Sequence, residues 1–286
     1  MKPAAFRYHL PASADEAIAV LAERGEGAKA LAGGQSLVPL LNMRLAAVSD
    51  LVDLNRCADL GSVRTADGWL EIGALARQRT VELSTEVRRE CPLLVDALRW
   101  VGHPPIRNRG TVGGSLVHAD PAAELPAAAV ALDAVLRVRG PGGERDVHAG
   151  AFFTGVFETA IAPDELLVAV RFPRVAPDAR CCFVELARRH GDFAIAGVAA
   201  VLRVAEGRVA EARVALAGVD ATPLRAAKAE AALAGQAPGR ELVAHAADLA
   251  AGECNPSADL HGSPDYRRQL VRVLVARALT SCAEAA

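Results

Sequence analysis

Two short runs of the sequence place adjacent glycines close before a serine. One is AGGQS at residues 32–36, and the other is TVGGS at residues 111–115, inside the longer run IRNRGTVGGSLVHADPAAELPA. Glycine has no Cβ, so its backbone N–H can closely approach an anion, and a following helix directs its unpaired first-turn N–H groups to the same point. A pyrophosphate is the natural occupant. The two runs together predict that both contact one phosphate-bearing cofactor.

Each run taken alone also has an ordinary interpretation, because most Gly-Gly pairs are simply turns. Neither run has the G-x-G-x-x-G spacing of a Rossmann dinucleotide site, or an acidic residue that closes a βαβ unit, which disfavours NAD binding of that kind. The six cysteines contain no C-x-x-C pair, so the sequence predicts no metal site and no iron–sulfur cluster in this chain.

The elements that position the first run follow from local signals. Ser13 and Glu16 have capping-box spacing, which predicts a helix that ends at Gly25. AKALAGG predicts a short buried strand that enters the glycine turn, and LVPLLNMRL predicts a short helix with Pro39 in its first turn. A second strand is predicted from Asp50.

The surroundings of the second run are more irregular. Residues 60–75 predict two strands joined by a turn at residues 66–68, with a helix near Thr80 and another opened by Pro92. Residues 102–114 are rich in Gly, Pro, Asn and Arg and predict a long loop. After it, ELPAAAVALDA predicts a helix, residues 134–149 a hairpin, and ELLVAVRFP a strand ended by Pro173.

The pattern changes near residues 175–179, which predicts a domain boundary. Strands are predicted near residues 182–187, 197–204 and 209–217, and helices at residues 223–234, 239–251 and 264–282. This order is typical of an α+β domain in which helices cover an antiparallel sheet.

Composition and charge exclude several classes of protein. The net charge of −2 lacks the basic excess that nucleic acid or an anionic membrane would require. No stretch reaches the roughly 18 uninterrupted apolar residues of a membrane span, and the first residues lack a secretion signal. With its cysteines expected as free thiols, the chain is predicted to be cytoplasmic.

The same motifs resemble those of a known family. AGGQSLVPLLNMRL, IRNRGTVGGSLVHADPAAELPA, RRHGDFA and GSPDYRRQLVRVLVARAL look like the FAD-binding medium subunit of bacterial molybdenum hydroxylases, which include aerobic carbon monoxide dehydrogenases and the flavin part of xanthine dehydrogenases. The resemblance covers essentially the whole chain. It implies an α+β fold of PCMH type, with FAD-binding subdomains at residues 1–56 and 57–177 and a C-terminal α+β domain of the carbon monoxide dehydrogenase flavoprotein type at residues 178–286.

The resemblance also implies partners and an electron path. The partners would be a small iron–sulfur subunit and a large molybdopterin subunit, in a heterotrimer that is often doubled. Substrate would be oxidised at molybdenum in another subunit, and this chain would bind FAD non-covalently and pass electrons from iron–sulfur clusters to quinone, NAD or oxygen. No catalytic acid or base is therefore assigned to this chain.

Carried over residue by residue, the resemblance assigns cofactor contacts to both glycine runs and to residues after them. Glu124 matches a position that is commonly Asp in relatives and is expected to hydrogen-bond ribityl or ribose hydroxyls. Phe193, next to Asp192, matches an aromatic position that covers one face of the isoalloxazine. Ile195 stands where xanthine-oxidising relatives have a lysine, which argues against transfer of their NAD chemistry. The full set of expected cofactor-binding residues is Ala32, Gly33, Gly34, Gln35, Ser36, Thr111, Val112, Gly113, Gly114, Ser115, His118, Asp120, Glu124, Asp192 and Phe193.

Several of these residues also have structural interpretations that the sequence leaves open. His118 could satisfy loop carbonyls, and Glu124 could be a first-turn helix charge. Asp192 could cap a chain reversal, and Phe193 could pack in the core.

Three further residues lie just before the second glycine run. His103 is predicted to be structural. Arg107 and Arg109 are interpreted either as part of a solvated loop or, with a slight preference, as interdomain or subunit contacts, because arginine favours buried and interface pairing.

Three classes of function fit the sequence. The favoured one is the electron-transferring flavoprotein subunit of a carbon monoxide dehydrogenase-like enzyme, with the flavin subunit of a xanthine or purine, N-heterocycle or aldehyde dehydrogenase as the alternative. A self-contained FAD-dependent oxidoreductase would need a substrate pocket with a placed base, and the sequence supplies no convincing base. A binding subunit that had lost its flavin would be expected to have eroded glycine runs, and both runs are intact.

Overall fold

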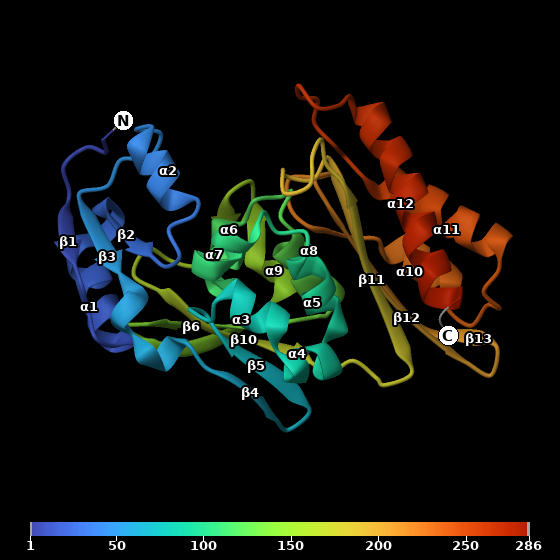
Figure 1. Cartoon of the computed structure of the whole chain (residues 1–286), viewed down its shortest axis with the longest axis horizontal. Helices are drawn as coiled ribbons and strands as arrows, with labels where there is room; N and C mark the ends of the chain where they lie inside the picture. The colour runs from blue at the N-terminus through green and yellow to red at the C-terminus, as the bar shows by residue number, and fades with distance from the viewer. Residues whose placement is uncertain (1, 285–286) are drawn as a thin grey trace.

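The computed structural model describes residues 2–284, which form three main sheets lying side by side with helices beside and between them (Figure 1). The first sheet is parallel, in the order β1-β3-β2, and consists of β1 (Arg7–His9), β2 (Ala28–Leu31) and β3 (Asp50–Asp53). It is accompanied by α1 (Ala14–Arg24), α2 (Leu37–Asn42) and the 3-10 turns η1 (Gly25–Gly27), η2 (Leu54–Arg56) and η3 (Ala58–Leu60). Because β2 and β3 are parallel neighbours, the residues that follow them meet at one edge of the sheet.

The capping signal at the start of α1 is confirmed. Ser13 Oγ accepts a hydrogen bond from the Glu16 N–H at 3.2 Å, and Glu16 Oε2 accepts one from the Ala12 N–H at 2.8 Å. The helix ends at Gly25, whose φ of +62° is accessible to glycine at little cost.

A buried carboxylate joins β1 to β3. Asp50 accepts hydrogen bonds from Arg7 Nε at 2.8 Å, Arg7 Nη2 at 2.7 Å and Ser49 Oγ at 2.7 Å, and His9 Nε2 lies 2.7 Å from its Oδ1. The hydrogen bonds from Arg7, and then those from His9 and Ser49, hold the pKa of Asp50 well below its usual value in spite of its burial. This network fixes the position of β1, in which Arg7 and Tyr8 are exposed and His9 is half-buried.

The second sheet is antiparallel, in the order β4-β5-β10-β6-β7. Its strands are β4 (Val63–Ala66), β5 (Trp69–Gly73), β6 (Val135–Gly140), β7 (Gly143–His148) and β10 (Leu166–Pro173). Helices cover one face of it in Figure 1: α3 (Gln78–Leu83), α4 (Thr85–Glu90), α5 (Pro92–Leu98), α6 (Pro104–Arg109), α7 (Val112–His118), α8 (Glu124–Ala131) and α9 (Ala149–Phe152), with a small hairpin of β8 (Phe153–Gly155) and β9 (Glu158–Thr159). Every residue of α8 is buried, which explains why this helix is apolar on nearly all sides.

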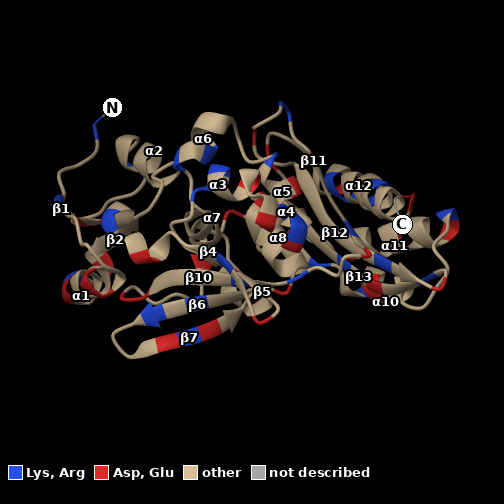
Figure 2. Cartoon of the chain, turned by 60° about the horizontal axis from the view of Figure 1, so that its bottom comes forward, with Lys and Arg blue, Asp and Glu red and all other residues tan. Residues whose placement is uncertain are grey.

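The opposite face of this sheet carries ion pairs, and Figure 2 shows acidic and basic residues side by side along β6 and β7. Arg137 Nε lies 3.2 Å from Asp146 Oδ1, and Arg139 Nη2 lies 2.6 Å from Glu144 Oε1. Such exposed pairs contribute little stability, but charged side chains discourage pairing of the edge strand β7 with another chain.

The third sheet is antiparallel, in the order β11-β12-β13-β14, which confirms the α+β arrangement predicted for this region. It consists of β11 (Ala179–Leu186), β12 (Ala196–Ala205), β13 (Arg208–Ala217) and β14 (Leu224–Arg225). One face packs against α10 (Ala227–Leu233), α11 (Arg240–Glu253) and α12 (Pro264–Glu284), and the other packs against α5 and α8 (Figure 1). The sheet is therefore the wall between the central helices and the C-terminal helices.

The prediction of a long loop at residues 102–114 is wrong, because this stretch contains α6 and the start of α7. Pro104 and Pro105 lie in the first turn of α6, where the missing proline N–H would have had no partner in any case. Thr111 caps α7, and its Oγ1 accepts a hydrogen bond from the Gly114 N–H at 3.0 Å.

Two smaller boundaries also differ from prediction. The helix near Thr80 ends at Leu83, and Ser84 caps a separate helix, α4, by accepting a hydrogen bond from the Val87 N–H. The helix predicted at residues 223–234 begins only at residue 227, because Leu224 and Arg225 pair with β13.

Candidate functional site

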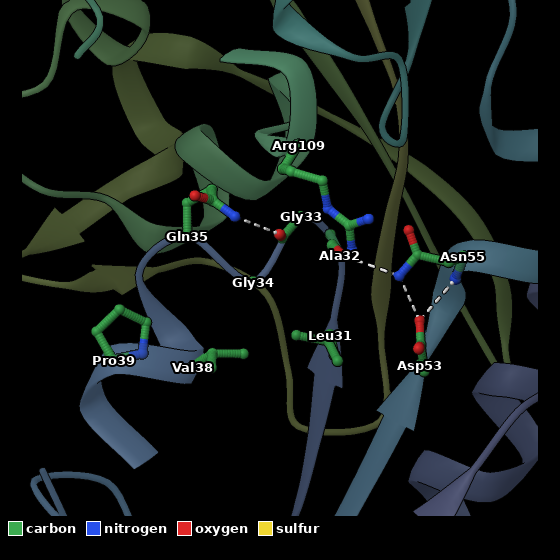
Figure 3. Close-up of a pocket in the computed structure, with 10 residues that line it drawn as sticks. All are labelled: Leu31, Ala32, Gly33, Gly34, Gln35, Val38, Pro39, Asp53, Asn55 and Arg109. Carbon is green, nitrogen blue, oxygen red and sulfur yellow. Dashed lines mark hydrogen bonds between the residues drawn. The ribbon is translucent and has the colours of Figure 1, made fainter. Parts of the chain in front are cut away.

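A cavity of about 380 Å³ opens where the first sheet meets α6 (Figure 3). One wall is the first glycine run with the start of α2, and the other walls come from the end of β3 and from α6. The lining residues are Leu31, Ala32, Gly33, Gly34, Gln35, Val38, Pro39, Asp53, Asn55 and Arg109. The cavity therefore contains four of the expected cofactor-binding residues, Ala32 to Gln35.

Gly33 allows two distant segments to touch. A Cβ on Gly33 would lie 2.4 Å from the Arg109 carbonyl oxygen and 2.8 Å from Gly110 Cα, and backbone atoms cannot easily move aside. The next residue, Gly34, has a φ of +74°, which turns the chain from β2 into α2. The Gly-Gly pair is thus required both for a close approach and for a turn.

The same run presents free donors to the cavity. Within residues 2–284, no hydrogen bond uses the backbone N–H of Gly33, Gly34, Gln35 or Ser36, while the Gly33 carbonyl accepts one from Gln35 Nε2 at 3.1 Å. Figure 3 shows the Arg109 side chain beside these residues. Unpaired N–H groups next to a guanidinium are a suitable environment for a diphosphate.

Polar side chains fix the walls of the cavity. Arg77 donates from Nη1 to the Arg109 carbonyl at 2.5 Å and from Nη2 to Asn55 Oδ1 at 2.6 Å, and Asn55 Nδ2 donates to the Ala32 carbonyl at 3.0 Å. The sequence patterns did not predict Asn55, Asp53 or Arg77 as site residues. The position of Asp53 and Asn55 could have indicated them, because they follow a parallel strand at the sheet edge where ligands commonly bind.

Asp53 is the acidic group of the cavity. Burial alone would raise its pKa, but hydrogen bonds from Tyr8 and Asn55 outweigh that effect, and Arg109 adds a favourable charge, so the pKa of Asp53 is lowered. Asp53 is therefore a carboxylate that can accept hydrogen bonds from a ligand's hydroxyl groups.

The second glycine run differs from its predicted form. Gly113 and Gly114 lie inside α7 and not in a loop before it, and the N–H groups of its first residues have partners within the chain. Val112 donates to the Ala76 carbonyl at 3.0 Å, and Gly113 donates to the Ala74 carbonyl at 2.9 Å. A Cβ on Gly113 would lie 2.6 Å from Ala74 Cβ, so this glycine serves the packing of α7 against the end of β5.

The two runs are nevertheless neighbours. A Cβ on Gly114 would lie 3.6 Å from Ala32 Cβ, so the first turn of α7 lies beside the first run. Thr111, Val112 and Gly113 are buried, and Ser115 is half-buried on the same helix. The residues from Thr111 to Ser115 are not among those that line the cavity.

His118 and Asp120 lie at and after the C-terminal end of α7. The His118 ring packs on Phe157 with centroids 5.0 Å apart, and burial lowers the pKa of His118. Asp120 Oδ1 accepts a hydrogen bond from the Ala122 N–H at 2.9 Å, which stabilises the turn into α8. Both residues have structural partners of their own.

Glu124 is the first residue of α8 and is only 7% exposed. Burial raises the pKa of Glu124 to about 7. Glu124 thus lies in the first turn of a helix, as the structural interpretation has it, but it is buried.

Asp192 and Phe193 lie on the turn between β11 and β12. Phe193 is 66% exposed, so its interpretation as a core residue is wrong. Asp192 Oδ2 accepts a hydrogen bond from Arg189 Nε at 3.2 Å within the turn. The turn touches the helices of the second sheet through His190, whose ring centroid lies 6.0 Å from that of His103, so the prediction of a structural role for His103 agrees with this contact.

Arg107 has a role that neither sequence interpretation described. Its Nε and Nη2 donate to Glu82 Oε2 at 2.8 Å and to Oε1 at 3.2 Å, and its Nη1 donates to the Val101 carbonyl at 2.8 Å. Both side chains are buried, so this ion pair joins α6 to α3 inside the helical layer and is not an interdomain contact.

The fold and the site define a class of flavoprotein, and comparison with known families identifies it. The model of the FAD binding domain in molybdopterin dehydrogenase matches residues 4–175, and that of the CO dehydrogenase flavoprotein C-terminal domain matches residues 182–282. The chain therefore belongs to the FAD-binding medium subunits of the molybdenum hydroxylases, which are oxidoreductase subunits.

Known relatives match over nearly their full length. The chain is 40% identical to the 6-hydroxypseudooxynicotine dehydrogenase complex subunit alpha of Paenarthrobacter nicotinovorans, covering 98% of this chain and 95% of that protein. It is 37% identical to the carbon monoxide dehydrogenase medium chain of Hydrogenophaga pseudoflava, covering 98% of each. A solved carbon monoxide dehydrogenase from Hydrogenophaga pseudoflava superimposes with a TM-score of 0.97 at 40% identity, over 99% of this chain and 98% of that one.

The family has an FAD-binding domain, so FAD is the cofactor that the cavity has to fit. Members of the family are medium subunits of multi-subunit enzymes. No helix among residues 2–284 is long and apolar enough to cross a membrane.

Proposed function

We propose that this chain holds FAD non-covalently, with the pyrophosphate in the cavity between the first glycine run and α6. The observation that carries this proposal is the set of N–H groups from Gly33 to Ser36 that lack partners within residues 2–284 and lie beside Arg109. The lining of the cavity contains no histidine, cysteine or tyrosine that could bind the flavin covalently.

The remaining expected residues complete the proposed site. Ala32 to Ser36 bind one side of the pyrophosphate, and Thr111 to Gly114, from α7, lie on its other side. Ser115, His118 and Asp120 lie beside the cofactor. Glu124 accepts hydrogen bonds from ribityl or ribose hydroxyls, and Phe193, with Asp192 beside it, covers one face of the isoalloxazine. Bound FAD supplies an electron carrier that accepts single electrons and delivers pairs. The chain binds and orients it.

We further propose a heterotrimer with a small iron–sulfur subunit and a large molybdopterin subunit, doubled in the complete enzyme, located in the cytoplasm, and passing electrons to quinone, NAD or oxygen. Residues 1–56 and 57–177 act as the two FAD-binding subdomains, and residues 178–286 as the C-terminal domain. The parallel first sheet and the antiparallel second sheet support a division near residue 56.

The enzyme to which the chain contributes is proposed to be of the carbon monoxide dehydrogenase type. The full-length likeness to carbon monoxide dehydrogenase medium chains supports this. A second candidate is an N-heterocycle dehydrogenase, which the 40% identity with the 6-hydroxypseudooxynicotine dehydrogenase subunit favours.

The purified holoenzyme tests both parts of the proposal. We expect flavin absorption, FAD released intact by acid, and bleaching of the flavin when carbon monoxide is added without oxygen. Bleaching by a hydroxylated nicotine derivative alone would select the second candidate. A protein without releasable FAD would contradict the function itself.

A further inference from the structure

Glu185 is a buried carboxyl group with no partner. It lies near the end of β11, it is 6% exposed, and neither of its side-chain oxygens has a hydrogen-bond partner within residues 2–284. A buried polar group without a partner is costly, so its retention calls for an explanation.

The strand register places Glu185 opposite the start of α8. Glu185 pairs with Gly197, and Gly197 pairs with Ala217, so these three residues form one row across the third sheet. Phe183, on the same side of β11, and Ala217 pack in the core that includes α8, so the row faces that helix. Gly197 has no side chain, so it places nothing beside Glu185, although a Cβ there would lie only 3.5 Å from Glu185 Cβ.

The chain before α8 is tied to the same row. The Gly218 N–H, next to Ala217, donates to the Pro121 carbonyl at 2.7 Å. Three residues further along, α8 begins with Glu124. The two buried glutamates therefore approach each other across the contact between the central helices and the third sheet.

Their charges are coupled. Burial first, and then the charge of Glu124, raise the pKa of Glu185 to about 8, while burial raises the pKa of Glu124 to about 7. The other charged groups that act on Glu124 are Asp120, which raises its pKa, and Arg107, which lowers it. From α5, which packs on β11, Asp96 acts on Cys181 at the other end of the strand. At neutral pH this pair is expected to hold at least one proton.

We propose that Glu185 is a positioning residue for Glu124: it keeps a proton and donates its carboxyl O–H to the Glu124 carboxylate, which is then held as an acceptor for the hydroxyls of FAD. This inference rests on the proposed function, in which Glu124 contacts the cofactor. The hydrogen bond gives the Glu185 carboxyl group the partner that it lacks, and no second charge has to be buried. Loss of that proton places two like charges together and turns Glu124 away from the ligand.

The affinity for FAD tests this role. The holoenzyme is stripped of flavin, and the Kd is measured from the quenching of FAD fluorescence between about pH 6 and about pH 9, for the wild type, Glu185→Gln, Glu185→Leu and Glu124→Gln. In the wild type we expect the Kd to rise above about pH 8, as the second proton of the pair is lost. Glu185→Gln keeps a donor and cannot ionise, so its Kd should stay within about threefold of the wild-type value at pH 7 and lose the rise at high pH.

Glu185→Leu removes the donor and should raise the Kd at pH 7 at least tenfold, roughly the effect of losing one hydrogen bond to a charged group. An unchanged Kd in Glu185→Leu, or an unchanged pH profile in Glu185→Gln, overturns the positioning role. If Glu185→Leu does not fold, the profile of Glu185→Gln decides. Glu124→Gln separates the two proposals. If this variant binds FAD with the wild-type Kd, the assignment of Glu124 to the cofactor fails. If Glu124→Gln binds FAD more weakly but the Glu185 variants bind it like the wild type, only the positioning role is refuted.

Discussion

At the level of single residues, the candidate site combines backbone N–H groups of the first glycine run with the side chains of Arg109, Asp53 and Asn55. The role of the N–H groups of the first glycine run could be predicted, because it depends on glycine itself. Arg109, Asp53 and Asn55 were harder to find, since each becomes part of the cavity only when α6 packs against the end of the first sheet. That contact depends on the missing side chain of Gly33, which no local pattern reveals.

Arg109 is expected to contribute affinity for the diphosphate. Arg109→Met should weaken FAD binding about tenfold or more, because a charge-assisted hydrogen bond contributes about 1.5–3 kcal/mol. Flavin fluorescence titration of the stripped holoenzyme measures the change. Arg240→Met, on exposed surface at the start of α11, is the matched control and should bind FAD like the wild type. Equal losses in both variants would refute a specific contact.

The buried glutamate pair predicts an unusual dependence of stability on pH. Both groups have raised pKa values in the folded chain, so their stabilising effect is complete below an unfolded pKa near 4.5 and is lost as the pH rises toward about 7 and about 8. The free energy of unfolding should therefore fall between about pH 5 and pH 8. Glu185→Gln should lessen that fall by about 2–4 kcal/mol, measured by denaturant unfolding at several pH values. Parallel curves for the two proteins would contradict the buried pair.

At the scale of elements, most of the strands and long helices could be predicted from periodicity and caps, and the error at residues 102–114 is instructive. Proline and glycine are typical of loops, but Pro104 and Pro105 occupy a first helical turn and Gly113 lies where α7 meets Ala74. Packing outweighed the low helix propensity of this stretch. The partner of Arg107, 25 residues away on α3, could not be predicted from sequence spacing.

The ion pair between α6 and α3 should be essential for stability. Arg107→Leu removes the buried partner of Glu82, which keeps only its pair with the more exposed Arg79, 2.8 Å away, and should lower the free energy of unfolding by about 3 kcal/mol. Arg99→Leu removes an exposed pair with Asp96, 3.3 Å apart, and should cost less than about 1 kcal/mol. Thermal unfolding of the two variants compares them directly, and similar midpoints would contradict the difference in burial.

At the scale of the whole molecule, the third sheet packs on both faces and places its β11–β12 turn beside α6 through His190 and His103. The predicted α+β class, with helices covering an antiparallel sheet in the C-terminal region, followed from the pattern of elements. The sequence pattern could not show that the cavity forms between the first sheet and α6, because that depends on how separate units pack. The resemblance to a family predicted FAD as the cofactor, whereas the glycine runs alone predicted only a phosphate-bearing ligand.

The FAD content of purified Gly33→Ala tests most directly whether the first glycine run and α6 together hold FAD. A methyl group would meet the Arg109 carbonyl at 2.4 Å and force the two walls apart, whereas Gly142→Ala, with no atom within 4 Å of its new Cβ, is the control. We expect one FAD per chain in the wild type and in Gly142→Ala, and an affinity at least about tenfold weaker in a folded Gly33→Ala. If folded Gly33→Ala retains FAD as the wild type does, the first glycine run and α6 do not hold the cofactor between them.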